Sequence, residues 1–409
     1  MDRPAFRDGA VVVSNGRINA VGDPRGLANA HRGADVIDLP RSIVLPGLVN
    51  AHTHLELSTC RAGDSPGAHF GEWILGIRKQ LAAQGDDFEA VVSRAVREGV
   101  RQSLRFGVTT LGDVSQQNHF TRPVLRDLPI RCVSYGETLG LAKNRPRHDE
   151  LLERALDATH RTDRLRIGLT PHAPYTVDLN DYQRCFQIAR ERALPLATHL
   201  AENPEERQFL EHQTGLFRDI WESLGMWEDS VETYRGSPIA FAHAIGLLDY
   251  PTLLAHVNYC DDAELALLSR GRASVVYCPR THAYFGHPPH QWREMLSRGV
   301  NVAVGTDSCA SSPDVNLVDD LRLLRSIAPD FPSQDVWEMA TARAARAVQM
   351  DDEVGTITRG KRADLVAFDA EGANPLESIL RDPRGPTHLW FDGALSPPAP
   401  ASPDPTLRG

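Results

Sequence analysis

The sequence predicts an α/β protein: a (β/α)8 (TIM) barrel with a small β-sandwich domain built from both ends of the chain. Three observations predict it. Short apolar runs alternate with segments of helical spacing between residues 48 and 307, eight such runs occur, and strand-like segments flank this region on both sides. A chain of 409 residues has room for one barrel of roughly 250 residues and a smaller domain.

The eight apolar runs end at polar turns and have the length of buried parallel strands. They are 48–54, 108–113, 130–137, 165–172, 195–200, 253–258, 273–279 and 300–307. Helical spacing is clear in 88–106 and in 261–270, where Gly271 provides a stop signal. A doubly wound open sheet is the alternative, but no glycine-rich phosphate loop follows the first run. The pattern therefore favours a closed barrel.

The flanking segments predict short strands rather than βα units. Strands are expected at 10–13, 17–21 and 36–39, with turns at 15–16 and 22–24, and again at 354–358 and 363–369. The predicted domains are thus 1–45 and 351–395 as two parts of one β-sandwich and 46–350 as the barrel. Residues 396–409, rich in proline and small polar residues, are expected to form a disordered tail.

Composition excludes several classes of function. The 44 basic and 54 acidic residues give a net charge of −10, which disfavours nucleic acid and anionic membranes as partners. No apolar run reaches the roughly 18 residues of a membrane span, and the first residues lack a signal peptide, so a cytoplasmic location is expected. The six cysteines are scattered without a CxxC pair, which indicates reduced thiols rather than disulfides or a cysteine zinc site.

Polar residues terminate four of the predicted strands. His52 and His54 lie two residues apart at the end of the first run, so their side chains point the same way. His199, with Glu202 three residues later, ends the fifth run, and the sixth and eighth runs end in a histidine and an aspartate, His256 and Asp307.

In a barrel these strand ends meet at one rim, where active sites of this architecture lie. Burying such residues singly and unpaired would be costly, which favours a shared ligand. Imidazoles and one carboxylate suit a single divalent cation, Zn²⁺ most simply, with Fe²⁺ or Mn²⁺ also compatible. A carboxylate that is not a ligand could then move protons between the bound water and a substrate.

These motifs resemble the amidohydrolase superfamily, in particular its metal-dependent deaminases and triazine chlorohydrolases. The resemblance rests on 45–54, 198–202, Cys278-Pro279, 305–307 and 360–366. It implies that His52, His54, His199 and Asp307 bind the metal, that Glu202 is the proton shuttle, and that His256 holds the attacking hydroxide, with Asp307 helping to orient it. The barrel and the composite β domain are implied as well.

The resemblance also bears on the number of metal ions. Binuclear members of the superfamily use a carbamylated lysine at the end of the fourth strand. The lysines of this chain are Lys79, Lys143 and Lys361, and none lies in the fourth run. One metal ion per chain is therefore expected.

Local motifs reduce the number of candidate substrates. The stretch 171–176 is similar to that of S-adenosylhomocysteine and methylthioadenosine deaminases, which implies that His172 contacts the substrate, but the ribose-binding glutamate of those enzymes, nine residues after Trp73, is absent here. Arg78, Gly136-Glu137 and 305–311 are closer to aminodeoxyfutalosine deaminases, whose substrate carries a benzoate. The predicted substrate contacts are His172, Trp73, Arg78, Arg280, His282 and Glu202, with Phe70, Arg145, Arg147 and His287 as further candidates.

The predicted function is hydrolytic removal of the 6-amino group of an adenine nucleoside, with 6-amino-6-deoxyfutalosine of menaquinone biosynthesis as the first candidate substrate. The alternatives are S-adenosylhomocysteine/methylthioadenosine or guanine deamination, hydrolytic dechlorination, and, in a different class, a noncatalytic structural relative. The sequence leaves the oligomeric state open, with a homodimer among the alternatives. Relatives have a further strand before residue 6, so either the start is misassigned or the β domain lacks an edge strand.

Overall fold

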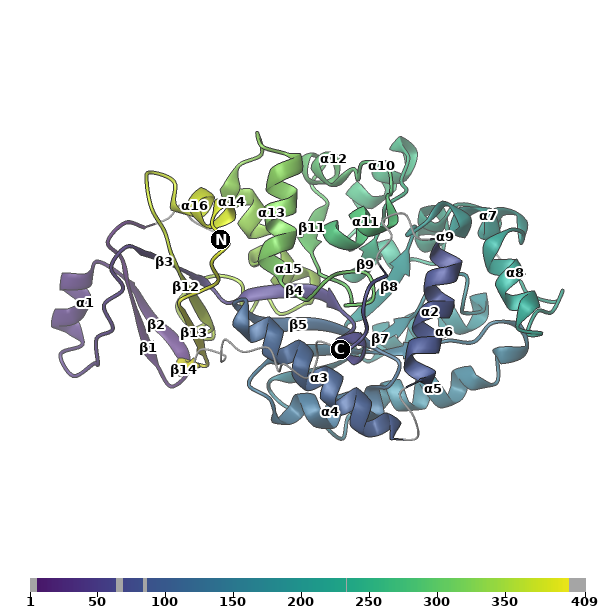
Figure 1. The fold of residues 1–409 in the computed structure, drawn as a ribbon, viewed down its shortest axis with the longest axis horizontal. Coiled ribbons are helices and arrows are strands. Elements are labelled where there is room, and N and C mark those ends of the chain that lie inside the picture. The colour runs from purple at the N-terminus through teal and green to yellow at the C-terminus, as the bar shows by residue number, and fades with distance from the viewer. Residues whose placement is uncertain (1–5, 64–68, 84–86, 233, 397–409) are drawn as a thin grey trace.

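A computed structural model describes residues 6–63, 69–83, 87–232 and 234–396 of the chain. It has two parts, a barrel surrounded by helices and a smaller β domain at one end (Figure 1). The barrel sheet has eight parallel strands in sequence order, which confirms the predicted (β/α)8 fold. Its strands are β4 (Leu48–Thr53), β5 (Val108–Ser115), β6 (Arg131–Thr138), β7 (Leu165–Pro171), β8 (Leu196–Leu200), β9 (Thr252–His256), β10 (Ser274–Tyr277) and β11 (Asn301–Val304).

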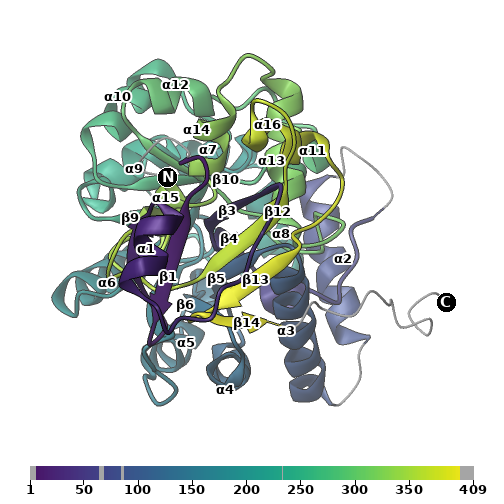
Figure 2. The same ribbon diagram turned by 90° about the vertical axis from the view of Figure 1, so that its left-hand side faces the viewer.

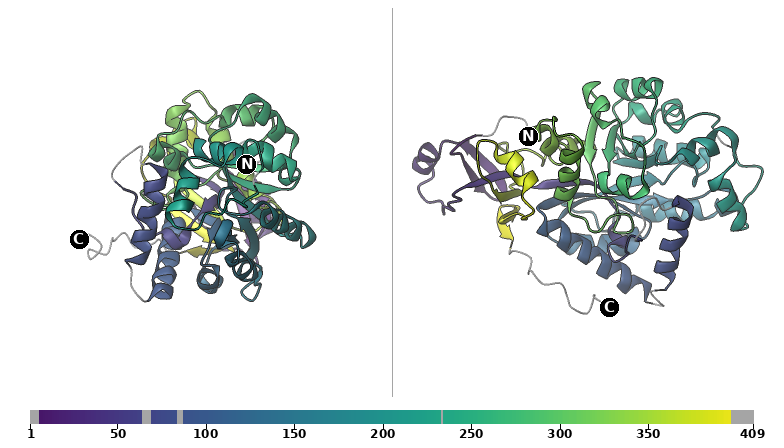
Figure 3. Two further views of the ribbon diagram at one scale, coloured as in Figure 1. Left: turned by 90° about the vertical axis from the view of Figure 1, so that its right-hand side faces the viewer. Right: turned by 45° about the horizontal axis from the view of Figure 1, so that its top comes forward.

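Helices cover the outer face of this sheet, as the view along the molecule shows (Figure 3). Nearly every residue of the barrel strands is buried, because side chains on one face pack inside the barrel and those on the other pack against the helices. The helices are α2 (Phe70–Ala82), α3 (Phe88–Arg105), α4 (Asn118–Asp127), α5 (Arg147–Leu156), α6 (Leu179–Glu191), α7 (Pro204–His212), α8 (Leu216–Ser223), α9 (Pro238–Ala244), α10 (Asp262–Arg270), α11 (Pro279–Phe285), α12 (Trp292–Ser297), α13 (Leu317–Ile327), α14 (Ser333–Glu338) and α15 (Ala342–Ala347), with 3-10 turns η1 (Leu55–Leu57), η2 (Ala142–Asn144) and η3 (Leu247–Asp249).

The barrel closes between β11 and β4 in an irregular way. The amide of Asp307 donates to the carbonyl of His52 at 3.0 Å, and the amide of Thr306 donates to the side-chain oxygen of Asn50 at 3.0 Å. Further along the seam, Val49 donates to the carbonyl of Ala340 at 2.8 Å. The seam therefore joins the strand that carries His52 directly to the aspartate that follows the last strand.

The small domain combines the two chain ends, as predicted (Figure 2). Strand β3 (Ser42–Pro46) pairs with β12 (Leu365–Asp369), which continues through β13 (His388–Phe391) to β14 (Ala394–Ser396). A separate hairpin of β1 (Ala10–Ser14) and β2 (Arg17–Gly22) packs against this sheet over a core that includes Ile18, Leu365 and Trp390. Helix α1 (Pro24–Ala30) follows the hairpin, and α16 (Pro375–Arg381) lies between β12 and β13.

Some sequence predictions for this domain are wrong. Residues 36–39 form no strand, and Val36 is 83% exposed. The expected turn at 22–24 instead begins α1, because Asp23 accepts a hydrogen bond from the amide of Gly26 at 2.7 Å and proline suits the first helical position. Residues 354–358 form no strand either, since Val354 packs into the floor of the barrel.

The end of the chain was also predicted imprecisely. Strands β13 and β14 were not expected, and Ser396, placed in the disordered tail by the sequence, is the last residue of β14. The rest of the predicted tail, 397–409, lies outside the described residues. Within the described part of the chain, no helix combines the length and the apolar character needed to cross a membrane.

A buried ion pair joins the two domains. The guanidinium of Arg131, at the start of β6, donates from Nε to Asp364 Oδ2 at 2.6 Å, and both side chains are essentially inaccessible to water. The same guanidinium bonds Asp392 and lies 5.0 Å from the centroid of the Phe391 ring. The pair therefore ties the bottom of the barrel to the loops before β12 and after β13.

Replacing Arg131 with Met is expected to lower the free energy of unfolding by about 3–5 kcal/mol, because it leaves the buried Asp364 carboxylate without its partner. The measurement is the midpoint of urea denaturation. Arg126→Met is the control, since Arg126 pairs with Asp127 at an exposed site and its loss should leave the midpoint unchanged. An unchanged midpoint for Arg131→Met would show that the pair contributes nothing to the domain contact.

Candidate metal centre

The five polar residues that terminate the strands lie together at the carboxyl end of the barrel. His52 is in β4 and His54 directly follows it, while His199 and His256 are in β8 and β9. Asp307 lies three residues after β11 and reaches the same place because its amide bonds the carbonyl of His52. The structure thus brings together the set of residues that the sequence singled out.

Two overlapping triads describe the geometry. Ligand atoms of His52, His54 and His199 lie within 4.8 Å of one another, and so do those of His52, His256 and Asp307. The Nε2 atoms of His54 and His199 are 3.3 Å apart, and Asp307 Oδ1 is 3.7 Å from His54 Nε2 and 4.0 Å from His52 Nε2. The donor atoms therefore point at a common centre.

This donor set fits a divalent cation. Both ring nitrogens of His52 and Nε2 of His256 are buried and have no hydrogen-bond partner among the described residues. Such atoms are costly to bury unless they have a ligand. Two nitrogens bound at about 2.0–2.1 Å in a tetrahedral zinc site lie roughly 3.4 Å apart, which matches the separation of the two Nε2 atoms of His54 and His199. The residues are therefore suited to hold one metal ion.

The protonation state of the histidines agrees with this use. Burial lowers the pKa of His199 to about 3 and that of His54 to about 4. Burial, and then the neighbouring imidazoles, also holds the pKa of His52 well below its usual value. Near neutral pH these rings are uncharged, and their lone pairs are available to a cation.

The backbone is strained where the site residues leave the strands. His256, Val257 and Asp307 have φ of 71°, 52° and 60°, and Ala201, between His199 and Glu202, has φ of 51°. These left-handed conformations are uncommon for residues other than glycine and cluster at functional sites. No glycine in the sequence signals them, so sequence reasoning could not have found this feature.

Glu202 lies beside the donor set but is not among the triads. Its Oε1 is 3.5 Å from His256 Nε2, and the side chain is almost fully buried. Burial, and then the charges of Asp307 and Glu206, raises the pKa of Glu202 well above its usual value. The hydroxyl of Tyr175 faces the same carboxyl group. Glu202 is therefore a buried carboxyl group with a raised pKa next to the donor set.

His172 and an aromatic cluster border the site. The His172 ring centroid is 4.8 Å from that of His199, and its Nδ1 bonds the Thr176 hydroxyl at 2.8 Å, which leaves Nε2 for another partner. Trp73 donates from Nε1 to the carbonyl of Ala310 at 2.8 Å, next to the loop that carries Asp307.

The indole of Trp73 belongs to an aromatic wall. Its ring lies 5.4 Å from Phe70 and 5.2 Å from Phe285, which in turn lies 5.6 Å from Phe70. Phe285, at the end of α11, was not singled out from the sequence, because an aromatic residue at a helix end is usually an ordinary packing residue.

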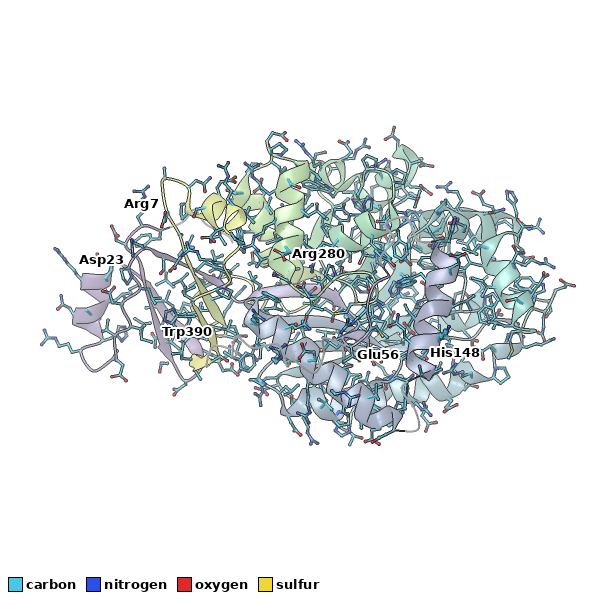
Figure 4. All side chains as sticks on the ribbon, in the orientation of Figure 1. Arg7, Asp23, Glu56, His148, Arg280 and Trp390 are labelled. Atoms are coloured by element: carbon cyan, nitrogen blue, oxygen red, sulfur yellow. The ribbon has the colours of Figure 1, made fainter. Side chains whose placement is uncertain are left out.

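The arginines predicted as substrate contacts are placed differently. Arg280 donates from Nε to Asp320 at 2.9 Å and from Nη1 to Asp314 at 2.7 Å, and its Nη2 bonds two main-chain carbonyls. These contacts engage all three guanidinium nitrogens, so Arg280 links α11 to the start of α13 and is not brought into the site as a free cation. Figure 4 shows Arg280 among the green helices of the outer layer. Arg145 is paired with Asp178.

Two basic candidates for substrate contact remain, and the structure describes the side chain of Arg147 but not that of Arg78. Arg147 Nη2 lies 3.5 Å from the side-chain oxygen of Gln116, whose amide donates to Glu137 at 3.4 Å. The side chain of Arg78 lies outside the described part of the structure, so this prediction stays a prediction.

Three histidines around α11 form a second group. His282 bonds the carbonyl of Pro288 at 2.9 Å through Nε2, and His287 Nδ1 bonds the Tyr259 hydroxyl at 3.0 Å. His290, which sequence reasoning missed, bonds the carbonyl of His256 at 2.9 Å. Its place in a proline-rich loop gave no periodic signal. Of these three, His290 thus contacts the strained end of β9 directly.

Comparison with known proteins agrees with the fold. A family model described as "Amidohydrolase family" matches residues 43–395, which include all five convergent residues. The 5-methylthioadenosine/S-adenosylhomocysteine deaminase of Syntrophobacter fumaroxidans is 31% identical over 385 residues, covering 90% of this chain and 81% of that protein.

Two solved structures share the fold. Helicobacter pylori aminofutalosine deaminase in complex with methylthio-coformycin superposes with a TM-score of 0.83 at 22% identity, covering 96% of this chain and 95% of that one. An adenosine deaminase from Xanthomonas campestris with bound Zn gives a TM-score of 0.79 at 24% identity, covering 95% and 88%. Since the family model spans most of the sequence, including every strand of the barrel, the chain belongs to the amidohydrolase family.

Proposed function

We propose that the protein is a metal-dependent hydrolytic deaminase that removes the 6-amino group of an adenine nucleoside. The observation that carries the proposal is the position of Glu202, a buried carboxyl group with a raised pKa whose Oε1 lies 3.5 Å from His256 Nε2, beside a donor set suited to one divalent ion. An acid next to a site for activated water is what hydrolysis of an amine-bearing ring carbon needs.

Each residue of the site has its own role in the proposed reaction. The ion, when bound by His52, His54, His199 and Asp307, supplies Lewis-acid chemistry that lowers the pKa of water toward neutrality. Glu202 gives a proton to ring nitrogen N1 as water adds to C6. His256 and Asp307 orient the water and accept its proton. Glu202 then takes the remaining proton of the added hydroxyl group and gives it to the amino group, the C6–N bond breaks, ammonia leaves, and the proton held by His256 and Asp307 returns to Glu202.

We propose one Zn²⁺ per chain. The three imidazoles and one carboxylate suit zinc, and the structural neighbour from Xanthomonas campestris is described with bound Zn. Fe²⁺ and Mn²⁺ are the alternatives that the ligand types leave. The fourth strand, β7, contains no lysine that could bridge a second ion.

The proposed substrate is 6-amino-6-deoxyfutalosine, converted to futalosine and ammonia, which would place the enzyme in menaquinone biosynthesis. This choice is supported by the motifs at 136–137 and 305–311 and by the absence of a glutamate at position 82, where alanine stands. The second candidate, 5-methylthioadenosine or S-adenosylhomocysteine, is favoured by the name of the relative at 31% identity.

Ammonia release over a panel of amines tests the proposal. With zinc-loaded protein, we expect kcat/KM for aminodeoxyfutalosine to exceed that for adenosine, methylthioadenosine, S-adenosylhomocysteine and guanine by at least about tenfold, since a benzoate adds contacts that the others lack. A preference for methylthioadenosine or S-adenosylhomocysteine would keep the deaminase and change its substrate. No hydrolysis of any compound would overturn the proposed function and favour a noncatalytic relative.

A further inference from the structure

The peptide groups of Glu202 are held on both sides by buried side chains. Its amide donates to Glu206 Oε2 at 3.0 Å, and its carbonyl accepts from Asn258 Nδ2 at 2.9 Å. Glu206 lies in the first turn of α7, and Asn258 follows β9, so the two contacts come from different elements. The main chain of Glu202 is thus fixed between them.

The segment between β8 and α7 needs such support. Ala201 has a left-handed backbone with φ of 51°, so the chain turns sharply just before Glu202. The adjacent β-ladder extends only as far as the bond from Tyr259 to the carbonyl of Ala201, at 3.1 Å. The orientation of the Glu202 side chain therefore depends on hydrogen bonds from outside the sheet.

The burial of Glu206 is not explained by helix capping. Asn203 already caps α7 by accepting from the amide of Glu206 at 3.1 Å. Glu206 is fully inaccessible, and a carboxyl group in such a place is costly unless it makes useful hydrogen bonds. Burial raises the pKa of Glu206 to about 8, and its carboxyl group faces the amides of Ala201 and Glu202.

We propose that Glu206 and Asn258 are positioning residues for Glu202: they clamp its peptide so that its carboxyl group stays beside His256 at the metal centre. The inference rests on the proposed role of Glu202 as proton shuttle. Neither residue touches the reacting atoms. Both act on the rate of proton transfer, because a displacement of a transferring group by about 1 Å costs on the order of 10²-fold in rate.

The positioning role is tested by substitutions of Glu206 that remove or retain the oxygen that accepts from the amide of Glu202. Glu206→Leu is expected to lower kcat about 10- to 100-fold with KM changed less than about threefold and one zinc per chain retained, since only the shuttle moves. Glu206→Gln keeps a carbonyl acceptor and should restore kcat to within about threefold of the original. Glu205→Gln is the matched control, because Glu205 is the neighbouring, partly exposed residue and should leave kcat unchanged. Asn258→Leu should reproduce the loss if Glu206→Leu does not fold.

A double variant distinguishes an effect that acts through Glu202 from a general disturbance of the structure. In a Glu202→Gln background, Glu206→Leu should cause no further loss of kcat, because the group it positions is gone. Unchanged kcat in both Glu206→Leu and Asn258→Leu, or an equal loss in Glu206→Gln and Glu206→Leu, would overturn the clamp while Glu202→Gln remains inactive. Full activity of Glu202→Gln would instead overturn the shuttle, and the clamp with it.

Discussion

Replacing Glu202 with Gln is expected to lower kcat by about 10²–10⁴-fold or more while one divalent ion stays bound. The amide has the shape of the carboxyl group but cannot take up and return a proton. Because Glu202 lies beside the ligand triads without belonging to either, its replacement should not disturb the donor set. The measurements are ammonia release in steady state and elemental analysis of the same sample.

Two results would contradict this expectation. Retained turnover would show that another group moves the protons, and loss of the metal would show that Glu202 is a ligand rather than a shuttle. Glu205→Gln, made three residues later in the first turn of α7, controls for the change of charge and should behave as the unmodified protein. KM should change little, since the proton moves mainly in the transition state.

Removal of the metal is expected to lower activity about as much as Glu202→Gln does. Separately, it is expected to lower the stability of the folded protein. Chelation should reduce turnover by several orders of magnitude, and zinc should restore it at one equivalent per chain. Zinc should also raise the melting temperature of the apoprotein, because an ion that binds only the folded state stabilises it by mass action. The buried, unpartnered nitrogens of His52 make this stabilisation expected, independently of any substrate.

Replacing one of the proposed metal ligands tests whether zinc acts at this site. His199→Ala should abolish both the zinc-dependent rise in melting temperature and the restored activity, because it removes one corner of the triad formed with His52 and His54. His243→Ala is the control, since His243 is exposed on α9 and its loss should change neither readout. Two ions per active chain, or an equal thermal shift in His199→Ala, would contradict a single site built on these residues.

The sequence could predict the barrel and the residues that meet at its rim because both depend on local patterns. Buried parallel strands appear as continuous apolar runs, and all eight were found within a few residues of their observed ends. A polar residue at the end of such a run is conspicuous, which is why the histidines of β4, β8 and β9 could be singled out. The same logic failed at 36–39, where apolar residues have no partner strand and Val36 is exposed.

By itself the sequence determined the order of the elements and the residue types that meet at one end of the barrel, since strand direction and side-chain alternation follow from short stretches of chain. Only the tertiary structure decided which of these side chains are already engaged by other residues of the protein. Arg280 was expected at the substrate but is engaged by Asp314 and Asp320, while Glu206 and Asn258, which carried no local signal, hold the backbone of Glu202. The physical reason is that a hydrogen-bond partner far away in sequence is chosen by packing, which no local pattern records.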